Sequence, residues 1–228
     1  MEAGSLADWY YPSTGATGYY GGGEYNSGNA DAVASVERAH TGLTSAKLTV
    51  NGSGGTRLFR WKEPRENREA NYSAWFYFPQ TLNITGWGNN IFQFKSVGAS
   101  TDPFWYIVLQ SSGGVLRPEM HWWDGLTVAG PHQGESGFKR YQPLVPVSVP
   151  VGRWLKIECF LRQSNAFDGA LRCTWDGTLI FDFTNVRTGY QNCNYNAWCV
   201  DQHWAVNNYS DAMDPASIYV DDAQISRP

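Results

Sequence analysis

The segment Asn89-Asn90-Ile91-Phe92-Gln93-Phe94-Lys95-Ser96 carries the clearest structural information in this chain. Its aromatic residues and its alternation of polarity predict a β-strand. Because successive side chains of a strand point to opposite faces, Phe92 and Phe94 share one face, and Gln93 and Lys95 share the other. The aromatic face is suited to a hydrophobic core. The Gln/Lys face is suited to a polar, anionic ligand.

The rest of the sequence predicts an all-β protein built in the same way. Only 17% of the 228 residues are charged, and 24 glycines separate aromatic segments, as in sandwiches and barrels. We predict one β-jelly-roll domain of two antiparallel sheets over residues 1–228, in which residues 1–30 form an irregular arm or a first strand. Residues 124–150 are expected to be loop-like, and Gly52-Ser53-Gly54-Gly55 is expected to be a turn. Strands are expected at 45–51, 56–62, 71–79, 90–97, 104–110, 117–123, 154–162, 170–175, 179–185 and 217–225.

The charge balance and hydropathy limit the classes of partner. The formal net charge of -4 argues against a general nucleic-acid binder, but leaves room for an anionic ligand at a local basic patch. No apolar run approaches the roughly 20 residues of a membrane helix. The start Met1-Glu2-Ala3-Gly4 resembles an added methionine on a mature secreted protein whose signal peptide was left off. A secreted monomer is therefore expected, with neither nucleic acid nor membrane as partner.

The four cysteines are compatible with an extracytoplasmic location. Cys159 and Cys173 flank a hairpin loop at 163–169, so they would face each other and could form a disulfide. Cys193 and Cys199 could close a small loop. Two disulfides imply an oxidising compartment, whereas four buried free thiols are the alternative.

Several strand motifs together resemble a known enzyme superfamily. They are Arg57-Leu58-Phe59-Arg60-Trp61, the segment 72–79 (Tyr-Ser-Ala-Trp-Phe-Tyr-Phe-Pro), and Phe92-Gln93-Phe94-Lys95, followed by Gly152-Arg153-Trp154 and Tyr219-Val220-Asp221-Asp222. This series resembles the polysaccharide lyase superfamily of heparin lyase I and the glucuronan lyases. The resemblance implies a concanavalin A-like lectin/glucanase jelly roll whose concave sheet binds an acidic polysaccharide. The chain lacks the Gln-Ile-His and Tyr-Phe-Lys-Ala-Gly segments of alginate lyases, which makes alginate a less favoured substrate.

The resemblance also implies a catalytic set. A histidine, a glutamine and a tyrosine surround the uronate in glucuronan lyases, and the matching positions here are His40, Gln93 and Tyr209. A uronate lyase removes the C5 proton next to a carboxylate, so it must offset negative charge and supply a base near the working pH. Histidine is such a base. Tyrosine can protonate the leaving O4, or can act as the base if nearby cations lower its pKa. This chemistry requires no metal or organic cofactor.

Further residues are expected to bind the substrate. Lys95 and Arg60 supply positive charge, and Arg60 could bind a carboxylate through two hydrogen bonds. Arg57 lies three positions from Arg60, so at most one of them faces the cleft of a regular strand. The remaining candidates are Asn207, His121 and Trp122, with His121, His132 and His203 as alternative bases.

Each candidate also has a purely structural interpretation. His40 could be a surface turn residue, Gln93 a cross-strand amide, Lys95 a residue at the sheet rim and Trp122 part of the core. At the end of the last strand, Asp222 could bind a structural Ca²⁺ together with Glu24, although a plain strand-end turn explains the Asp pair as well.

Three functions remain open from the sequence. The first is an extracellular lyase acting on a polyuronate such as glucuronan. The second is a non-catalytic carbohydrate-binding module or lectin on the same fold. The third is a jelly-roll glycoside hydrolase, which needs two paired carboxylates, and the usual alternation of Glu and Asp on one strand is absent.

Overall fold

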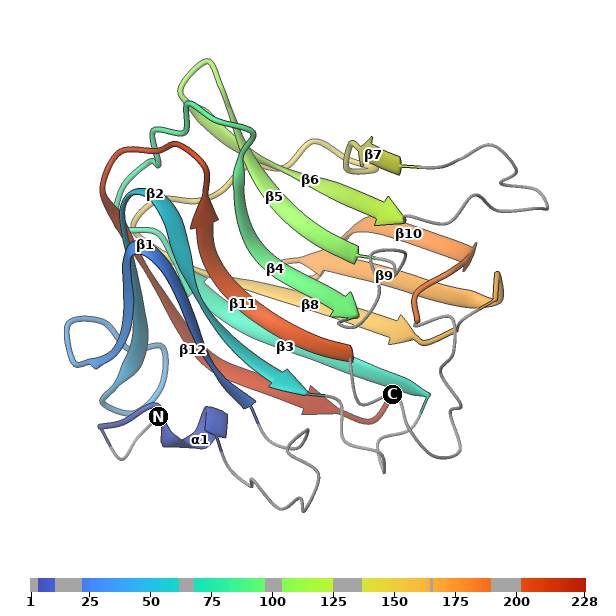
Figure 1. Ribbon diagram of the computed structural model, residues 1–228, viewed down its shortest axis with the longest axis horizontal. Coiled ribbons are helices and arrows are strands. Elements are labelled where there is room, and N and C mark those ends of the chain that lie inside the picture. The colour runs from blue at the N-terminus through green and yellow to red at the C-terminus, as the bar shows by residue number, and fades with distance from the viewer. Residues whose placement is uncertain are drawn as a thin grey trace.

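The computed structural model describes residues 4–10, 22–61, 68–96, 104–124, 137–164, 166–189 and 202–228. These ranges form an almost entirely β structure in which the named strands pair in antiparallel fashion (Figure 1). None of its helices is long and apolar enough to cross a membrane. The elements are α1 (Ala7–Tyr10), β1 (Gly22–Ser35), β2 (Ser45–Trp61), β3 (Glu69–Tyr77), β4 (Asn89–Ser96), β5 (Phe104–Ser112), β6 (Val115–Asp124), β7 (Gly137–Tyr141), β8 (Trp154–Arg162), β9 (Gly169–Trp175), β10 (Thr178–Val186), β11 (Gln202–Ser210) and β12 (Ala216–Ser226).

The strands form one hydrogen-bonded path that folds into two layers. Its order is β10-β9-β8-β3-β12-β2-β11-β4-β5-β6-β7, and β1 also pairs with β2. The first part of β2, residues 46–50, pairs with β12, whereas residues 54–61 pair with β11. We call the layer that continues through β11, β4, β5, β6 and β7 the front sheet, because it lies toward the viewer in Figure 1. The layer that continues through β12, β3, β8, β9 and β10 is the back sheet.

Strand β2 passes from one sheet to the other, and the turn predicted at 52–55 is wrong. Gly52 and Gly54 have φ angles of 105° and 108°, a region that favours glycine. They therefore bend the strand without ending it. A side chain on Gly54 would also collide with the Ser27 carbonyl of β1. The glycines permit the change of sheet and the close approach of β1.

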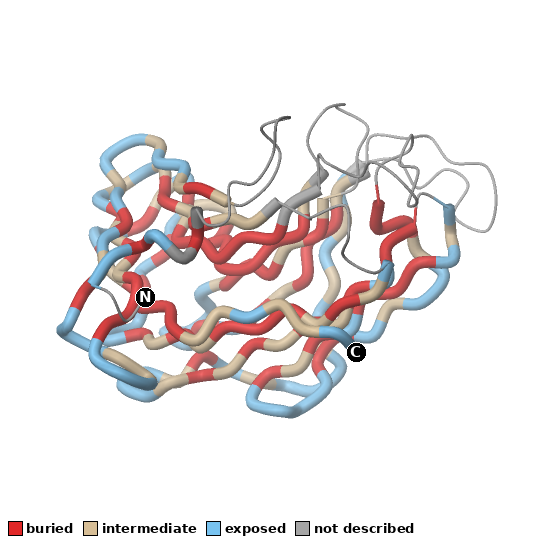
Figure 2. The backbone as a smooth tube through the Cα atoms, turned by 90° about the horizontal axis from the view of Figure 1, so that it is seen from below, coloured by how far each residue is buried: buried red, intermediate tan, exposed pale blue. Residues whose placement is uncertain are grey.

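The core lies between the two sheets and follows the predicted alternation. Phe92 and Phe94 are buried and lie opposite aromatic rings of β3. The ring centroid of Phe92 is 6.4 Å from that of Phe76, and Phe94 is 5.0 Å from Tyr72. Figure 2 shows buried positions along the strands of both layers. The jelly-roll sandwich predicted from the sequence is therefore confirmed.

One predicted disulfide is present in the back sheet. Cys159 of β8 pairs in register with Cys173 of β9, and their sulfur atoms are bonded. Both residues are fully buried. Cys193 and Cys199 lie outside the described residues. The neighbouring Asp176-Gly177 pair has positive φ at both positions and forms the tight turn between β9 and β10, as its sequence indicates.

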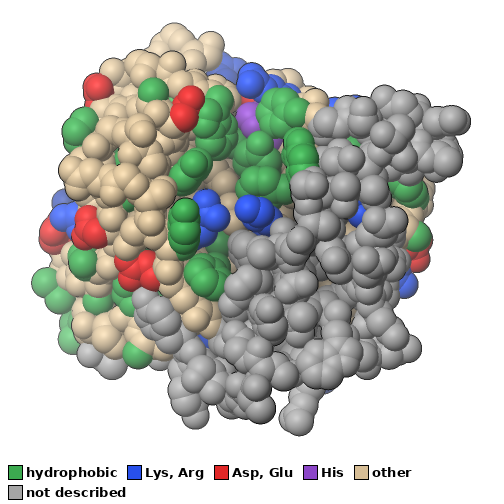
Figure 3. All heavy atoms as spheres, viewed as in Figure 1, with side chains coloured by type: hydrophobic (Ala, Val, Ile, Leu, Met, Phe, Trp, Pro, Cys, Tyr) green, Lys and Arg blue, Asp and Glu red, His purple; other side chains and the backbone are tan. Residues whose placement is uncertain are grey.

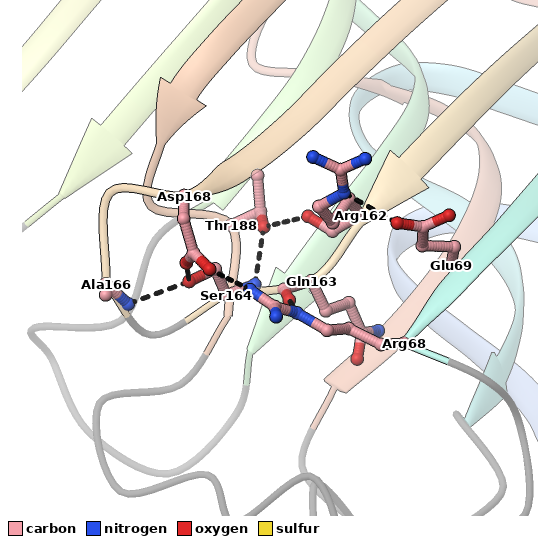
Figure 4. A network of polar contacts seen from close by, with 8 residues as sticks. All are labelled: Arg68, Glu69, Arg162, Gln163, Ser164, Ala166, Asp168 and Thr188. Carbon is pink, nitrogen blue, oxygen red and sulfur yellow. Dashed lines mark hydrogen bonds and ion pairs between the residues drawn. The ribbon is translucent and has the colours of Figure 1, made fainter.

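A polar network holds one end of the back sheet together (Figure 4). The Arg68 side chain donates to the Gln163 carbonyl at 2.6 Å and to the Asp168 carboxylate at 2.5 Å. Ser164 donates a short hydrogen bond to Asp168, and Thr188 Oγ1 accepts from the Ser164 backbone. The Ser164 and Arg68 hydrogen bonds lower the pKa of Asp168. The network joins the start of β3 to the β8–β9 connection and to the residues after β10.

Candidate functional site

The outer surface of the front sheet, which we call the front face, carries a row of polar side chains in strict register. Gln93 of β4 pairs with Tyr106 of β5, Tyr106 pairs with His121 of β6, and His121 pairs with Arg140 of β7. Residues that pair directly across antiparallel strands point to the same face. The row therefore places an amide, a phenol, an imidazole and a guanidinium side by side across four strands.

Gln93 forms a buried cluster with two other amide side chains, those of Asn90 and Asn207. Its Oε1 accepts hydrogen bonds from Asn90 at 2.8 Å and from Asn207 at 3.1 Å. Asn207 Nδ2 also donates to Asn90 Oδ1 at 3.0 Å, while Asn207 Oδ1 is buried and has no partner among the described residues. The structure thus brings together Gln93 and Asn207, two of the predicted site residues. A buried oxygen without a hydrogen bond costs stability, so Asn207 Oδ1 suits a binding site better than a scaffold.

His121 is fixed in one orientation by a carboxylate. Its Nε2 lies 3.0 Å from Glu119 Oε2, and its side chain is fully buried. A neutral imidazole must donate from Nε2 to this carboxylate, which leaves Nδ1 with a lone pair. Nδ1 has no hydrogen-bond partner in the described part of the chain. Burial lowers the pKa of His121, although the Glu119 hydrogen bond opposes that shift, so the ring is neutral at pH 7.

Trp87 lies between Tyr106 of the row and Tyr209 of β11. The Trp87 ring centroid lies 6.2 Å from Tyr106, 6.4 Å from His121 and 6.1 Å from Tyr209. Tyr106 meets His121 edge-on at 5.3 Å. Burial raises the pKa of Tyr106 to about 12, so its hydroxyl keeps its proton at neutral pH. The aromatic rings provide apolar faces next to hydrogen-bonding groups, the combination that sugar rings require.

Two cations, Arg57 and Lys95, lie partly buried on this face. The Arg57 guanidinium lies over the rings of Tyr25 at 5.1 Å and Tyr209 at 5.5 Å. Burial lowers the pKa of Lys95, and the positive charge of Arg57 lowers it further. In the described part of the chain, no carboxylate pairs with either cation. Figure 3 shows Lys and Arg side chains at the centre of this face, between hydrophobic ones. Partly buried cations that repel each other need an anionic partner, which a ligand can supply.

Arg60 is not part of this face, so its predicted role is corrected. It pairs in register with Trp204, whose side chain is in the core, and its Nη1 donates to the Trp9 carbonyl at 3.4 Å. Arg57 pairs with Asn207 on the front face instead. The two arginines thus point to opposite faces of β2, as expected, but the one on the front face is Arg57. Nothing in the local sequence distinguishes them, because the face depends on the partner strand.

Trp122 is a core residue and not a sugar platform. It is 5% exposed, and its ring lies 5.9 Å from Trp105 between the sheets. Alternation along β6 directs Trp122 to the core and its neighbours to the front face. Trp123, which pairs with Phe104 and Phe138, is the tryptophan of β6 that lies on the front face. His132 lies outside the described residues.

His40 does not join Gln93, which corrects the predicted catalytic set. It stacks on Trp75 of β3 at 3.8 Å, and its Nδ1 lies 2.6 Å from Asp222 Oδ2. Its backbone N–H donates to Asp221 Oδ2 at 2.8 Å. Trp75 points away from the core on the back sheet, so His40 and Gln93 lie on opposite outer faces of the sandwich. The loop before β2 is held by contacts with residues far away in the sequence, such as Trp75 and Asp222. The local sequence around His40 gives no indication of these contacts.

The residues suggested for calcium are also apart. Asp222 contacts His40 and Thr41 at the back sheet, whereas Glu24 lies on β1 and bonds Asn26. Glu24 pairs in register with Leu58, in the part of β2 that belongs to the front sheet. Among the described residues, no group of three His, Cys, Asp or Glu side chains could hold a metal ion.

The structure adds five front-face residues that the sequence does not single out for the site. Tyr106, Glu119 and Arg140 occupy or support the row, Asn90 completes the amide cluster, and Trp87 separates the two tyrosines. The alternation in β5 and β6 could have indicated Tyr106 and Glu119. Trp87 lies in a loop, and no periodicity indicates where a loop residue points.

Comparison with known proteins identifies the fold. No protein-family model matches the chain, and no curated protein matches it. The endo-β-1,4-glucuronan lyase of the fungus Trichoderma reesei matches with a TM-score of 0.64 at 12% identity, covering 90% of each chain. An alginate lyase from Chlorella virus matches at 0.57 with 10% identity over 92% of this chain and 94% of that one, and the PL-14 alginate lyase of the marine Aplysia kurodai at 0.57 with 11% identity over 90% of each. At these identities the likeness shows the fold alone: the chain has the jelly roll of polysaccharide lyases.

Proposed function

We propose that this protein is a polysaccharide lyase that cleaves a uronate-containing polysaccharide by β-elimination on its front face. The observation that carries the proposal is the row of Gln93, Tyr106 and His121 beside Arg57 and Lys95, two cations that pair with no carboxylate of the described residues. Similar folds include glucuronan and alginate lyases, which is consistent with an acidic polysaccharide as the substrate. The buried disulfide is consistent with an extracytoplasmic enzyme.

The first task of such a site is to bind and neutralise the uronate carboxylate. Arg57 and Lys95 are close enough for the charge of one to lower the pKa of the other. A carboxylate between them would remove this repulsion and would gain charge-assisted hydrogen bonds. The buried amide cluster of Gln93, Asn90 and Asn207 supports the floor between the cations. Neutralising the carboxylate makes the neighbouring C5 proton easier to remove.

The second task is to remove the C5 proton. We assign it to His121, because its Nδ1 lone pair has no partner among the described residues and its ring is neutral at pH 7. The ring is fully buried, so the neighbouring rings of Trp87 and Phe138 must move aside for C5 to reach Nδ1. When His121 takes the proton it becomes an imidazolium, and Glu119, 3.0 Å from Nε2, stabilises that charge. This replaces His40, which is held on the back sheet, as the base expected from the sequence.

The third task is to protonate the departing O4. Tyr106 is assigned here, because it directly contacts His121 and keeps its proton at neutral pH, since burial raises its pKa to about 12. The C5 proton and O4 leave from adjacent carbon atoms, so the base and the acid must be neighbours. Tyr209 lies beyond Trp87 and next to Arg57. We therefore assign Tyr209 to substrate binding at the carboxylate end of the site.

The two alternative functions, a carbohydrate-binding module and a glycoside hydrolase, would require other sets of side chains on the front face. A carbohydrate-binding module would use the cations and aromatic rings, but it does not require a buried histidine whose Nδ1 has no hydrogen-bond partner among the described residues. A retaining glycoside hydrolase needs two carboxylates roughly 5–5.5 Å apart. On the described front face, Glu119 bonds His121 and Gln142 and has no second carboxylate beside it in the row.

The experiment is to incubate the protein with glucuronan, heparin, hyaluronan, alginate and pectate. The ultraviolet absorbance of the unsaturated uronate product is followed, and a neutral β-glucan is scored by its reducing ends. A rise on one polyuronate would support the lyase and identify its substrate. Reducing ends released from the glucan alone would indicate a hydrolase, and retention on an immobilised polyuronate without product would indicate a binding module.

A further inference from the structure

The outer surface of the back sheet, which we call the back face, has a pocket that the proposed reaction does not use. Its volume is about 320 Å³, near the lower end of the roughly 300–1,000 Å³ of small-molecule sites. Its floor comes from β2 and β12, where Thr49 pairs in register with Ser217 and Lys47 with Tyr219. These positions alternate with the core residues Leu48 and Ile218, so they face outward.

The pocket is lined by small polar groups and flat apolar ones. The hydroxyls of Thr49 and Ser217 bond each other at 2.9 Å on the floor. At the rim, the amides of Asn51 and Gln80 are exposed and make no hydrogen bond to another described residue. The apolar part of the lining consists of Pro79, Pro215, Ala216 and Tyr219. Hydroxyls and amides next to apolar faces match a sugar ring, which has hydroxyls at its edge and C–H groups on its faces.

The charge of this pocket differs from that of the front face. Lys47 is the charged residue in its lining, and its Nζ lies 2.7 Å from Glu37 Oε1. Tyr219 also donates to Glu37, so the carboxylate is shared between the two. The Glu37 hydrogen bond raises the pKa of Lys47, so both side chains stay ionised. The pair therefore carries no net charge. On the front face, in contrast, Arg57 and Lys95 pair with no carboxylate of the part of the chain that the structure describes. An acidic sugar would find no free cation in the back-face pocket.

The walls of the pocket are held by contacts outside it. The segment after β3 is joined to the turn before β12 by a bridge between Ile84 and Met213. Asn83 Nδ2 donates to Asp214 Oδ2 at 2.8 Å, and the Asp214 N–H donates to the Asn83 carbonyl at 3.0 Å. These bonds fix the two proline-containing walls relative to the floor. A preformed pocket loses little conformational entropy when a ligand binds.

We propose that this back-face pocket binds one neutral sugar unit of a polysaccharide. The molecule then has two carbohydrate sites of different charge on opposite faces of the sandwich: an anionic-sugar site at Arg57 and Lys95, and a neutral-sugar site at Thr49 and Ser217. The second site would hold the protein on a neutral or mixed polysaccharide while the front face acts on uronate residues. Binding of a neutral sugar at the back face does not depend on catalysis at the front face, so it can be measured without any product being formed.

The test is a titration of the protein with neutral tetrasaccharides of glucose, mannose and galactose, followed by calorimetry and by NMR shifts of backbone amides. The protein is produced in a host without N-glycosylation, because Asn51-Gly52-Ser53 is an acceptor sequence at the rim. We expect binding of one neutral sugar type, with shifts in β2 and β12. The double variant Asn51→Ala/Gln80→Ala should bind about tenfold more weakly, since two hydrogen bonds are lost.

Two further variants serve as controls for the location of the bound sugar. Gln224→Ala removes an exposed amide of β12 outside the pocket and should leave binding unchanged. Arg57→Ala alters the front face and should also leave it unchanged. The proposal would be overturned if no neutral tetrasaccharide bound, if the Asn51/Gln80 double variant bound as well as the wild type, or if Arg57→Ala abolished binding. Binding of a uronate tetrasaccharide with shifts in β2 residues 47–51 would overturn the neutral character of the pocket.

Discussion

At the scale of single residues, Arg57 and Arg60 provide a matched pair of variants. Arg57→Ala should lower kcat/KM on the cleaved polyuronate by about 10- to 100-fold, because a charge-assisted hydrogen bond to the carboxylate is lost. Arg60→Ala also removes an arginine side chain from β2, but one that does not lie on the front face. It should change kcat/KM by less than about threefold. Steady-state kinetics on both variants measure the difference. Equal losses would show that Arg57 has no special role in binding the substrate.

His121 and Glu119 predict the pH dependence of the reaction. A base must be deprotonated, so kcat/KM should rise with pH through the pKa of His121, which burial lowers below its usual 6.5. The acidic limb is therefore expected below about pH 6.5, with a plateau through neutral pH. The Glu119 hydrogen bond raises this pKa. Glu119→Gln should move the acidic limb to lower pH and reduce the plateau rate. A limb that stays in place in Glu119→Gln would exclude His121 as the titrating base.

The orientation of side chains in β4 can be predicted from the sequence, whereas the faces of β2 cannot. Phe92 and Phe94 are in the core, and Gln93 is on the front face, because one strand with two core aromatics has only one consistent orientation. Arg57 and Arg60 share a strand with aromatic and aliphatic residues on both sides. Their orientation depends on pairing with residues of β11, which lie about 150 residues away in sequence.

At the scale of elements, the disulfide between β8 and β9 should contribute to stability. It closes a loop with a sequence separation of 14 residues, for which chain entropy gives about 3 kcal/mol. Cys159→Ala/Cys173→Ala should therefore unfold at a lower urea concentration, with a loss of about 2–4 kcal/mol. Treatment with a reductant under unfolding conditions should destabilise the wild type and leave the variant unchanged. Equal urea midpoints for the wild type and the variant would contradict the expected contribution.

Gly55 connects the bend of β2 to the site. A Cβ at this position would lie 2.5 Å from the Asn208 carbonyl and 2.5 Å from Tyr209 Cα, which are backbone atoms that cannot move aside. Gly55→Ala should cost about 1–3 kcal/mol of stability and displace β11 at Tyr209, with a loss of polyuronate binding. Ser53→Ala, an exposed position in the same bend, is the control. Thermal unfolding and substrate titration check both effects, and a fully stable, active Gly55→Ala would contradict this packing.

Strands with alternating aromatics agree with the sequence prediction to within a few residues, but three features of the sheet differ from it. The predicted break at 52–55 is a bend in one long strand, because positive-φ glycines allow a strand to curve as well as to stop. β11 (Gln202–Ser210) lies outside the predicted strands, since Asn207 and Asn208 are poor strand formers and are tolerated only through side-chain hydrogen bonds. β7 (Gly137–Tyr141) lies in a segment expected to be loop.

At the scale of the whole molecule, the two outer faces differ in the side chains that they present. The front face combines the cations Arg57 and Lys95 with amides and His121, whereas the back face holds His40 between Trp75 and Asp222. The resemblance predicts the fold, which is confirmed, but the catalytic set that it implies groups His40 with Gln93, whereas His40 lies on the back face. Which face a loop covers depends on contacts between distant residues, such as the hydrogen bond from His40 to Asp221.

The most direct test of the front-face site compares the two histidines. His121→Gln and His40→Ala are assayed for unsaturated product on the polyuronate that the wild type cleaves, after circular dichroism has shown that both are folded. We predict that His121→Gln loses about 10²- to 10⁴-fold in kcat, because the general base is gone. His40→Ala should keep its rate while unfolding at a lower temperature, because the Trp75 stack and the Asp222 contact are lost. A His40→Ala variant without activity, beside an active His121→Gln, would contradict the assignment of His121 as the base.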